Sequence, residues 1–319
     1  MTRRMGRRDI LSMASGGASG VLAGCLSSDT DDSPGRGREL RLGSKLFAEN
    51  QLFAWLGFES LQSRTDVQPV HRLGMGQFGE NWRALRRGEI DCYWEYTGTL
   101  RNFVDIAPSQ EFDSATALYE AAAAAVASET DIRLQEPAPL DNRYVLLARP
   151  DWAERTGVET IGGLLDRLRE QPDSTSVAFG PDFRTRPDGW NALLRHYGLD
   201  AARRASIRPA TTEVDPLLVY DHLRAGLFDV AVGYATSPQL ERWTFTQLED
   251  DRGFFSFYEP VALVRSEHAD ATAILESLDA ATRSIDTVET VRRLAARIVF
   301  DGDAPRTVAQ EYLRQSGSG

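Results

Sequence analysis

A supersecondary unit occurs twice in this chain and restricts the folds that it can adopt. Residues 84–96 read ALRRGEIDCYWEY, and residues 222–234 read HLRAGLFDVAVGY. Each is the end of a helical pattern, a glycine that stops it, an apolar residue, an aspartate and a strand-like run. In both copies a tyrosine lies five residues after the aspartate, at Tyr96 and Tyr234. We expect two similar lobes; the alternative is coincidence, because helix–glycine–strand turns are generic.

Strand and helix patterns alternate along most of the chain. The sequence predicts strands at 39–44, 67–74, 89–94, 142–150, 176–181, 227–234, 245–251 and 259–265. It predicts helices at 50–64, 78–88, 114–128, 187–199, 214–226, 269–285 and 287–299, and a loop followed by a helix over 157–170. This order predicts an α/β fold with a mainly parallel sheet. Ligands of such sheets bind beyond the carboxyl ends of the strands, where Tyr96 and Tyr234 are expected.

The first 38 residues have the pattern of a targeting segment and a tether. The arginines at 7–8 resemble a twin-arginine export signal, and the run LAGC ending at Cys25 resembles a lipobox. The apolar run between them is too short to span a bilayer. We predict an export signal over 1–25 with lipidation at Cys25, then a flexible linker over 26–38. The alternative is a basic, disordered N-terminal tail.

Almost all of the basic residues in this chain are arginines. Lys45 is the only lysine, and 47 acidic residues outweigh 36 basic ones to give a net charge of −11. The excess of acids argues against bulk binding to nucleic acid or to an anionic membrane surface. With the arginine bias, it indicates an extremely halophilic source. Keeping one lysine suggests that position 45 needs a compact ammonium group, unless it is a chance survivor.

The sequence lacks the usual catalytic and metal-binding motifs. There is no GxSxG elbow, no HExxH pair and no Walker loop, and the four histidines have no ligand-like spacing. The run GMGQFGE at 74–80 lacks the preceding strand and the acid of a dinucleotide site. Two cysteines, Cys25 and Cys92, exclude a disulfide framework and a paired-cysteine zinc site. We therefore predict no enzymatic activity, no cofactor and no metal.

The remaining candidates for a functional site are tyrosines near the ends of predicted strands. They are Tyr96, Tyr144, Tyr234 and Tyr258. Ring faces suit a quaternary ammonium ion, which has no N–H to donate and is held by cation–π attraction worth about 2 kcal/mol when desolvated. Such short contacts persist at about 1 M salt, where the screening length is about 3 Å. Taken singly, a tyrosine at a strand end more often packs half-buried than binds a ligand.

Several blocks of the sequence resemble one known family, the osmoprotectant-binding proteins of ABC importers (the ProX/OpuC-type binders of glycine betaine and choline). GSKLFAEN (43–50) resembles the family's GSKxFxEq, and GEIDCYWEYTGT (88–99) resembles GeIDxYpEYTGT. Four further blocks match in order: DNRYVLLARPDWAE (141–154), FRTRPDG (183–189), GLFDVAVGYAT (226–236) and LEDDRGFFSFY (248–258). Trp94, Ser237-Pro238 and Ser256 depart from the family pattern. The resemblance extends over about residues 39 to 315.

The resemblance implies a type II periplasmic-binding-protein fold, in which two hinge strands join two α/β lobes. We expect lobe one over 39–144, lobe two over 145–252, and a return to lobe one over 253–319.

The resemblance also implies which residues hold the ligand. The cage for the cation would be Tyr96, Tyr144, Tyr234 and Tyr258. The ligand carboxylate would meet Lys45, Thr99 and Arg186, and a backbone carbonyl near Asn142 would contact the headgroup. Glu95 and Asp188 are expected to be structural, and Trp94 could face either the ligand or the core.

The function that the resemblance implies is capture of a compatible solute outside the cell. We expect a lipid-anchored monomer on the extracellular face of the membrane, exported by the twin-arginine route. It would bind a quaternary ammonium solute such as glycine betaine and deliver it to the permease subunits of an ABC importer. A ligand sensor for a membrane receptor is an alternative on the same fold, and an exported enzyme is a third.

Overall fold

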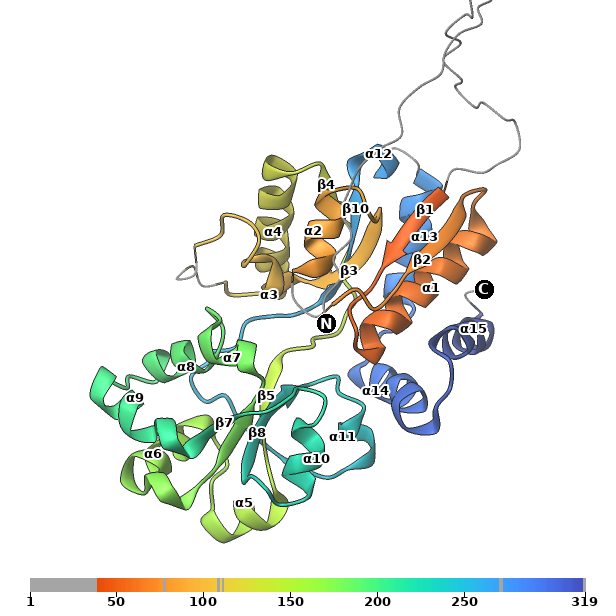
Figure 1. Cartoon of the computed structure of the whole chain (residues 1–319). Coiled ribbons are helices and arrows are strands. Elements are labelled where there is room, and N and C mark those ends of the chain that lie inside the picture. Colours follow the sequence, from red (N-terminus) through yellow and green to blue (C-terminus); the bar gives the residue numbers. More distant parts are fainter. Residues whose placement is uncertain (1–38, 77–78, 108–109, 111, 270–271, 318–319) are drawn as a thin grey trace, which may run out of the picture. The chain divides into compact units, whose positions relative to one another are not determined.

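Two five-stranded sheets organise the part of the chain that the structure describes. In the computed structural model this part comprises residues 39–76, 79–107, 110, 112–269 and 272–317, which belong to one compact unit. The predicted export signal, the linker and the lipidation site at Cys25 lie outside these residues. Figure 1 shows the two sheets, and we call the parts built on them lobe one and lobe two. The lobe boundaries given above stay predictions.

The two sheets have the same strand topology. In lobe one the order is β2 (Gln68–Arg72), β1 (Glu39–Gly43), β3 (Cys92–Tyr96), β10 (Pro260–Arg265), β4 (Ile132–Leu134). In lobe two the order is β7 (Thr211–Glu213), β6 (Val177–Phe179), β8 (Val230–Tyr234), β5 (Tyr144–Ala148), β9 (Thr246–Leu248). The first three strands of each list are parallel, and the other two continue the sheet by antiparallel pairing. The doubled unit of the sequence therefore supplies the central strand of each sheet, β3 and β8.

Helices accompany both sheets. Lobe one carries α1 (Ala48–Arg64), α2 (Glu80–Arg86), α3 (Thr97–Leu100), α4 (Ala115–Glu129), α12 (Ser266–Ala269), α13 (Thr272–Arg283), α14 (Val288–Ala296), η3 (Arg297–Asp301) and α15 (Pro305–Ser316). Lobe two carries α5 (Pro150–Thr156), α6 (Ile161–Glu170), η1 (Pro172–Ser174), α7 (Pro181–Thr185), α8 (Trp190–His196), α9 (Ala201–Ile207), η2 (Arg208–Ala210), α10 (Val219–Arg224) and α11 (Gln239–Arg242). Alternate residues of β3 enter different cores, Trp94 with α1 and α13 and Tyr93 with α2 and α4. The sheet is thus covered on both faces. It is mixed rather than mainly parallel as predicted, because β10 pairs antiparallel with both β3 and β4, and lobe two is mixed in the same way.

The glycines of the doubled unit end their helices in the same way. Gly88 and Gly226 have φ angles of 69° and 77°, the left-handed region that favours glycine. In each copy the next residue donates its N–H to a carbonyl five residues earlier, at 2.9 Å in lobe one and 3.0 Å in lobe two. This is the pattern of a helix stopped by a glycine C-cap.

The aspartates of the doubled unit tie the central strand to its parallel neighbour. Asp91 accepts the backbone N–H of Arg41 in β1 at 2.8 Å. Asp229 accepts the backbone N–H of Ser176, just before β6, at 2.9 Å. The same bond in both lobes explains why the aspartate recurs and confirms that the two sequence segments are structurally equivalent.

Trp94 belongs to the core of lobe one. Its side chain is fully buried, its indole N–H donates to the Thr282 hydroxyl at 2.8 Å, and its ring stacks on Phe53 with centroids 6.3 Å apart. A Cβ atom at Gly57 would lie 2.2 Å from Cη2 of this indole. Glycine at position 57 therefore makes room for the tryptophan that replaces the family's usual proline, and the choice left open by the sequence falls on the core side.

Gly57→Ala is expected to lower the free energy of unfolding by about 1–3 kcal/mol, because the added methyl group overpacks the core against Trp94. Denaturant unfolding of the two proteins measures this loss. Gly163→Ala is the control, since its Cβ would meet only ordinary contacts at 3.4 Å or more. An unchanged midpoint for Gly57→Ala would contradict the packing described here.

Two predicted helices begin later than expected. One is α10, predicted from residue 214, which begins at Val219, and the other is α8. The prediction placed Pro187 and Asp188 in the first turn, but α8 begins at Trp190. The side chain of Asp188 is bonded to Arg186, and a Cβ at Gly189 would lie 2.0 Å from the carbonyl oxygen of Phe183. This close approach forms a turn between α7 and α8, and the tertiary contacts of the turn displace the start of the helix.

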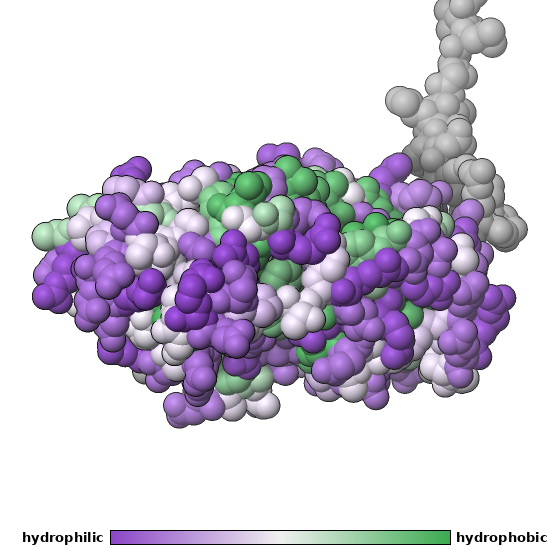
Figure 2. All heavy atoms as spheres, turned by 90° about the horizontal axis from the view of Figure 1, so that it is seen from below, coloured by the Kyte–Doolittle hydropathy of each residue, from purple (hydrophilic) through white to green (hydrophobic). Residues whose placement is uncertain are grey.

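The described surface is mainly polar. Figure 2 shows one face on which hydrophilic residues surround a smaller hydrophobic area. The large apolar side chains that are exposed are Leu46, Leu217, Leu218, Leu227, Tyr234 and Val299. Within the described ranges, no helix combines the length and the apolar character needed to cross a bilayer.

Candidate functional site

The predicted site residues gather where strands of both sheets end. Tyr96 and Tyr234 are the last residues of the central strands β3 and β8. Tyr144 begins β5 directly opposite Tyr234 in the antiparallel register. Tyr258 comes shortly before β10, which pairs with β3. This is the edge of an open α/β sheet at which ligands bind.

Tyr144 is the centre of the ring cluster in lobe two. Its ring centroid lies 5.0 Å from that of Tyr234, 5.8 Å from Tyr258 at an interplanar angle of 81°, 4.7 Å from Phe183 and 6.0 Å from Phe255. Tyr144 and Tyr258 are buried, whereas Tyr234 is 39% exposed. Three of the four predicted cage tyrosines are therefore linked by ring contacts through Tyr144.

Phe47 connects the fourth tyrosine to this cluster. Its ring stacks on Tyr96 with centroids 6.1 Å apart and on Tyr234 with centroids 6.5 Å apart, at interplanar angles of 27° and 10°. Phe47 precedes α1 in lobe one, and Tyr234 ends a strand of lobe two. The sequence prediction missed Phe47, although it lies inside the quoted block GSKLFAEN.

Gly98 explains the hydroxyl–glycine–hydroxyl run after Tyr96. A Cβ at Gly98 would lie 2.6 Å from the carbonyl oxygen of Phe257 and 2.8 Å from the ring of Tyr258. Thr97 before it donates its N–H to Glu259 at 3.0 Å and accepts the N–H of Glu259 at 3.1 Å. The run therefore holds the segment that carries Tyr258 against the end of β3.

Arg186, predicted to bind a carboxylate, is already bonded to one. Its guanidinium makes two hydrogen bonds of 2.7 Å to Asp188 and lies 5.6 Å from the ring centroid of Tyr144. The Tyr258 hydroxyl donates to the same carboxylate. Burial alone would raise the pKa of Asp188, but the hydrogen bonds and charge of Arg186 outweigh it and hold that pKa below its usual value.

Lys45 is also paired. Its buried ammonium group bonds the buried carboxylate of Glu95 and lies 5.0 Å from the ring centroid of Tyr96. Glu95 further accepts the Tyr93 hydroxyl at 3.2 Å and the Tyr96 N–H at 3.0 Å. These bonds agree with the structural role expected for Glu95 and Asp188. Asp188 pairs with an arginine, whereas Glu95 pairs with Lys45, the only lysine in the sequence.

Thr99 and Asn142 border the rings. Thr99 is buried in α3, and its carbonyl accepts the N–H of Asn102 at 3.0 Å. Asn142 donates its N–H to the carbonyl of Tyr258 at 2.9 Å. Its side-chain Oδ1 is buried, and no described residue bonds it. Asn142 is therefore held against Tyr258, while contact of either residue with a ligand stays a prediction.

Glu49 is a functional candidate that the sequence prediction missed. It accepts the Tyr96 hydroxyl on Oε1 at 2.8 Å and the Thr236 hydroxyl on Oε2. Tyr96 comes from lobe one and Thr236 follows β8 of lobe two, so this carboxylate links the two lobes. Burial raises the pKa of Glu49 to about 7, although both hydrogen bonds and the charge of Lys45 act in the other direction.

One described cluster has the residue types of a metal site. Ligand atoms of Asp91, Glu267 and His268 lie within 4.8 Å of one another. However, Arg41 bonds both carboxylate oxygens of Asp91, with its Nε and a second nitrogen at 2.8 and 2.7 Å. A guanidinium in this position repels a cation, and we interpret the cluster as a structural link between β1 and β3.

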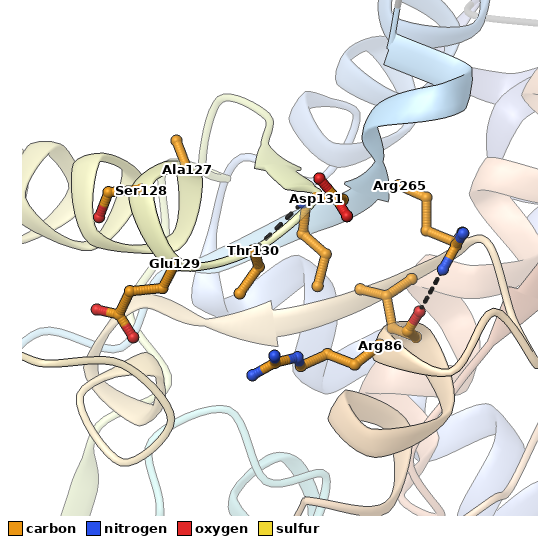
Figure 3. A pocket seen from close by; sticks show the side chains of 9 residues that line it. Arg86, Ala127, Ser128, Glu129, Thr130, Asp131 and Arg265 are labelled. Carbon is orange, nitrogen blue, oxygen red and sulfur yellow. Dashed lines mark hydrogen bonds between the residues drawn. The ribbon is translucent and has the colours of Figure 1, made fainter.

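A cavity of about 380 Å³ lies at the other end of the lobe-one sheet from Tyr96. Its lining comes from the ends of α2, α4 and β10 and includes Arg86, Glu129, Asp131 and Arg265. Figure 3 shows these side chains and the hydrogen bond from Arg265 to the Leu85 carbonyl, which is 3.1 Å long. None of its lining residues is aromatic, so the cavity is unlike the ring cluster and offers a quaternary ammonium ion no ring face.

Comparison of the sequence with protein-family models identifies the family of this chain. The model for the substrate binding domain of ABC-type glycine betaine transport systems (OpuAC) matches residues 38–315. The chain belongs to this family. As a member, it is a substrate-binding protein of ABC transporters and not an enzyme.

Two curated relatives of this OpuAC-family chain are similar over most of their length. The glycine-betaine-binding protein of Pseudomonas aeruginosa is 30% identical over 293 residues, which cover 86% of this chain and 87% of that protein. The chemotactic signal transduction system substrate-binding protein CosB of Halobacterium salinarum is 29% identical over 289 residues, 86% of this chain and 83% of that protein.

Solved structures of the family agree with the fold described above. The crystal structure of a glycine betaine/carnitine/choline ABC transporter protein matches with a TM-score of 0.71, 20% identity, and coverage of 88% of this chain and 99% of that chain. At this identity the likeness shows the fold alone. It confirms the predicted periplasmic-binding-protein fold with two α/β lobes.

Proposed function

We propose that this OpuAC-family protein captures a quaternary ammonium compatible solute, of the glycine betaine and choline class, outside the cell. The observation that carries the proposal is the row of rings from both lobes, Tyr96, Phe47, Tyr234, Tyr144 and Tyr258. Ring faces hold a methylated ammonium ion that cannot donate an N–H hydrogen bond. The name of the Pseudomonas aeruginosa relative supports the same solute class.

Capture would work by closure of the lobes on the solute. Phe47 and Glu49 of lobe one contact Tyr234 and Thr236 of lobe two, so a cation among the rings would strengthen contacts made only in the closed form. A ligand that binds the closed form better shifts the population towards it. We propose that this form docks on the permease subunits of an ABC importer. Anchoring through Cys25 after twin-arginine export, a monomeric state and a halophilic source stay predictions.

The assignment of individual contacts also belongs to this proposal. Tyr96, Tyr144, Tyr234 and Tyr258 would form the cage, and a carbonyl near Asn142 would contact the headgroup. Contact of a ligand carboxylate with Lys45, Thr99 and Arg186 stays a prediction. It would have to compete with Glu95 and Asp188, which already bond the two bases.

A second role on the same site is presentation of the closed form to a membrane receptor. The name of the Halobacterium salinarum relative, a chemotactic signal transduction protein, favours this candidate. The genes beside the one for this chain distinguish the roles, because an importer needs permease and ATPase subunits and a sensor needs a receptor.

A thermal-shift panel in concentrated salt tests the proposed function. Choline, glycine betaine or carnitine at about a hundredfold excess over Kd is expected to raise Tm by roughly 5 °C, since such an excess stabilises the folded state by about 2.7 kcal/mol. Glycine, which lacks the methyl groups, is the matched control and should leave Tm unchanged. A panel that also includes ectoine and gives no shift with any solute would overturn the proposal.

A further inference from the structure

We propose that Glu49 sets the charge preference of the site, acting as a buried counter-ion that favours a cationic quaternary ammonium solute, such as choline, over a zwitterion such as glycine betaine. The inference rests on the proposed function and narrows it, because it assigns the selection of the solute's net charge to one carboxylate.

The charges around the rings leave Glu49 in excess. Lys45 is bonded to Glu95, and Arg186 is bonded to Asp188, so each base is already matched by a buried or mostly buried acid. Within the described part of the chain, Glu49 makes no ion pair with a lysine, arginine or histidine. The two pairs cancel. Of the other charges that act on the cage tyrosines, Arg101 acts on Tyr258 and Asp182 on Tyr234 with opposite sign, so an ionised Glu49 leaves the ring cluster with a net negative charge. A cation completes this balance, whereas the carboxylate of a zwitterion would have to compete with Glu95 for Lys45 and with Asp188 for Arg186.

The position of Glu49 puts that charge between the rings of the two lobes. Its two oxygens accept the hydroxyl of Tyr96 and the hydroxyl of Thr236, two residues after Tyr234. The residue is only 4% exposed, so its field is weakly screened by water. It also lies in the first turn of α1, where the helix dipole favours a carboxylate.

The charged and titratable groups that face Glu49 come from three places. Lys45 precedes α1 and is shared with Glu95 of β3, and Tyr96 of β3 donates its hydroxyl. From α14, Arg292 donates to the Ala235 carbonyl at 2.7 Å, next to Thr236. Lys45 and Arg292 thus have other acceptors, and Glu49 keeps its charge available for a solute.

Cation binding at this carboxylate is linked to proton release. The pKa of Glu49 is raised to about 7 by burial, so near neutral pH the residue is only partly ionised. A bound cation stabilises the ionised form and expels the proton. If only the ionised form binds choline, the affinity rises about tenfold from pH 6 to pH 8 and levels off above, following the ionised fraction.

Titration calorimetry on the full chain tests the inference. Choline and glycine betaine are titrated into wild type at pH 6 and pH 8, each in two buffers of different ionisation enthalpy, which reports the protons released. The variant is Glu49→Gln. The matched control is Glu59→Gln, which removes one acid from the same helix at the side bonded to Arg306.

We expect choline to release close to one proton per molecule at pH 6 and almost none at pH 8.5, and to bind more tightly than glycine betaine at pH 8. Glu49→Gln should weaken choline about tenfold or more, abolish its pH dependence, and change glycine betaine by less than about threefold. Glu59→Gln should behave as wild type.

Equal losses for both solutes in Glu49→Gln, or choline binding without proton release, would overturn the role of Glu49 while leaving the proposed function intact. Failure of every quaternary ammonium solute to bind wild type would instead defeat the proposed function itself. If Glu49→Gln does not fold, the proton count of the wild-type protein decides the question alone.

Discussion

Tyr144→Ala is expected to weaken binding of a quaternary ammonium solute by about 3 kcal/mol, roughly a hundredfold, because central aromatic residues dominate such sites. The ring of Tyr144 contacts Tyr234, Tyr258 and two phenylalanines, so its loss removes one cage face and leaves its neighbours unsupported. Burial raises the pKa of Tyr144 well above its usual value. The phenol therefore stays neutral, and the ring itself, rather than a phenolate charge, would hold the cation. Calorimetry with choline and glycine betaine measures the loss.

Tyr144→Phe is the matched variant, since it keeps the ring and removes only the hydroxyl. We expect it to bind within about threefold of wild type, because the attraction comes from the ring face. Circular dichroism must show that Tyr144→Ala is folded, since truncating a buried aromatic residue costs about 3–5 kcal/mol of stability. A folded Tyr144→Ala that binds as well as wild type would remove this ring from the cage.

The repeated architecture could be predicted because its signals are local. Each copy of the unit spans about a dozen residues. In each copy the glycine, Gly88 or Gly226, has a positive φ angle. The aspartate three residues later accepts a backbone N–H from the neighbouring parallel segment. The tyrosines at the strand ends follow from the same pattern, because parallel strands of one sheet end at one edge.

The internal pairing of the site could not be predicted in the same way. Lys45 is separated from Glu95 by 50 residues, and Thr236 from Glu49 by 187. Only the folded structure, and not the local sequence, shows that Lys45 bonds an acid. Phe47 and Glu49 stood inside a recognised block, but nothing in the spacing indicated that they touch lobe two. The predicted carboxylate-binding residues include two bases, Lys45 and Arg186, whereas in the folded site each of them already bonds an acid.

Some elements were also missed, among them the helices α5, α9 and α15 and several shorter ones. The helices α3, α7 and α11 and the strands β4 and β7 have too few residues to show a periodicity. Two of these short elements nevertheless position the site. α3 contains Gly98 beneath Tyr258, and α7 contains Phe183 beside Tyr144.

Glu49→Gln is expected to stabilise the protein at pH 8 by about 1–3 kcal/mol while weakening choline binding. In wild type the pKa of Glu49 is about 7 when folded, against about 4.3 in an unfolded chain. Between these values the folded state holds a proton that the unfolded state releases, so raising the pH destabilises the fold until Glu49 ionises. The total loss is about 4 kcal/mol and is complete about one pH unit above 7. Glutamine carries no charge to desolvate, but it offers the two hydroxyls one acceptor fewer, which offsets part of the gain.

Denaturant unfolding of wild type, Glu49→Gln and Glu59→Gln at pH 5 and pH 8 separates this effect from the other acids. Asp91 and Asp188 have pKa values below the usual one, so their contribution grows as the pH rises towards the ordinary aspartate pKa of about 4 and is constant above about pH 5. The difference between wild type and Glu49→Gln therefore isolates one carboxylate, and it should widen from pH 5 to pH 8. Equal differences at both pH values would mean that Glu49 ionises as readily in the folded chain as in the unfolded one. At pH 8 the ionised, buried Glu49 lowers the stability of the free protein, and bound choline should restore that stability. This is the behaviour expected of a carboxylate whose charge serves ligand binding.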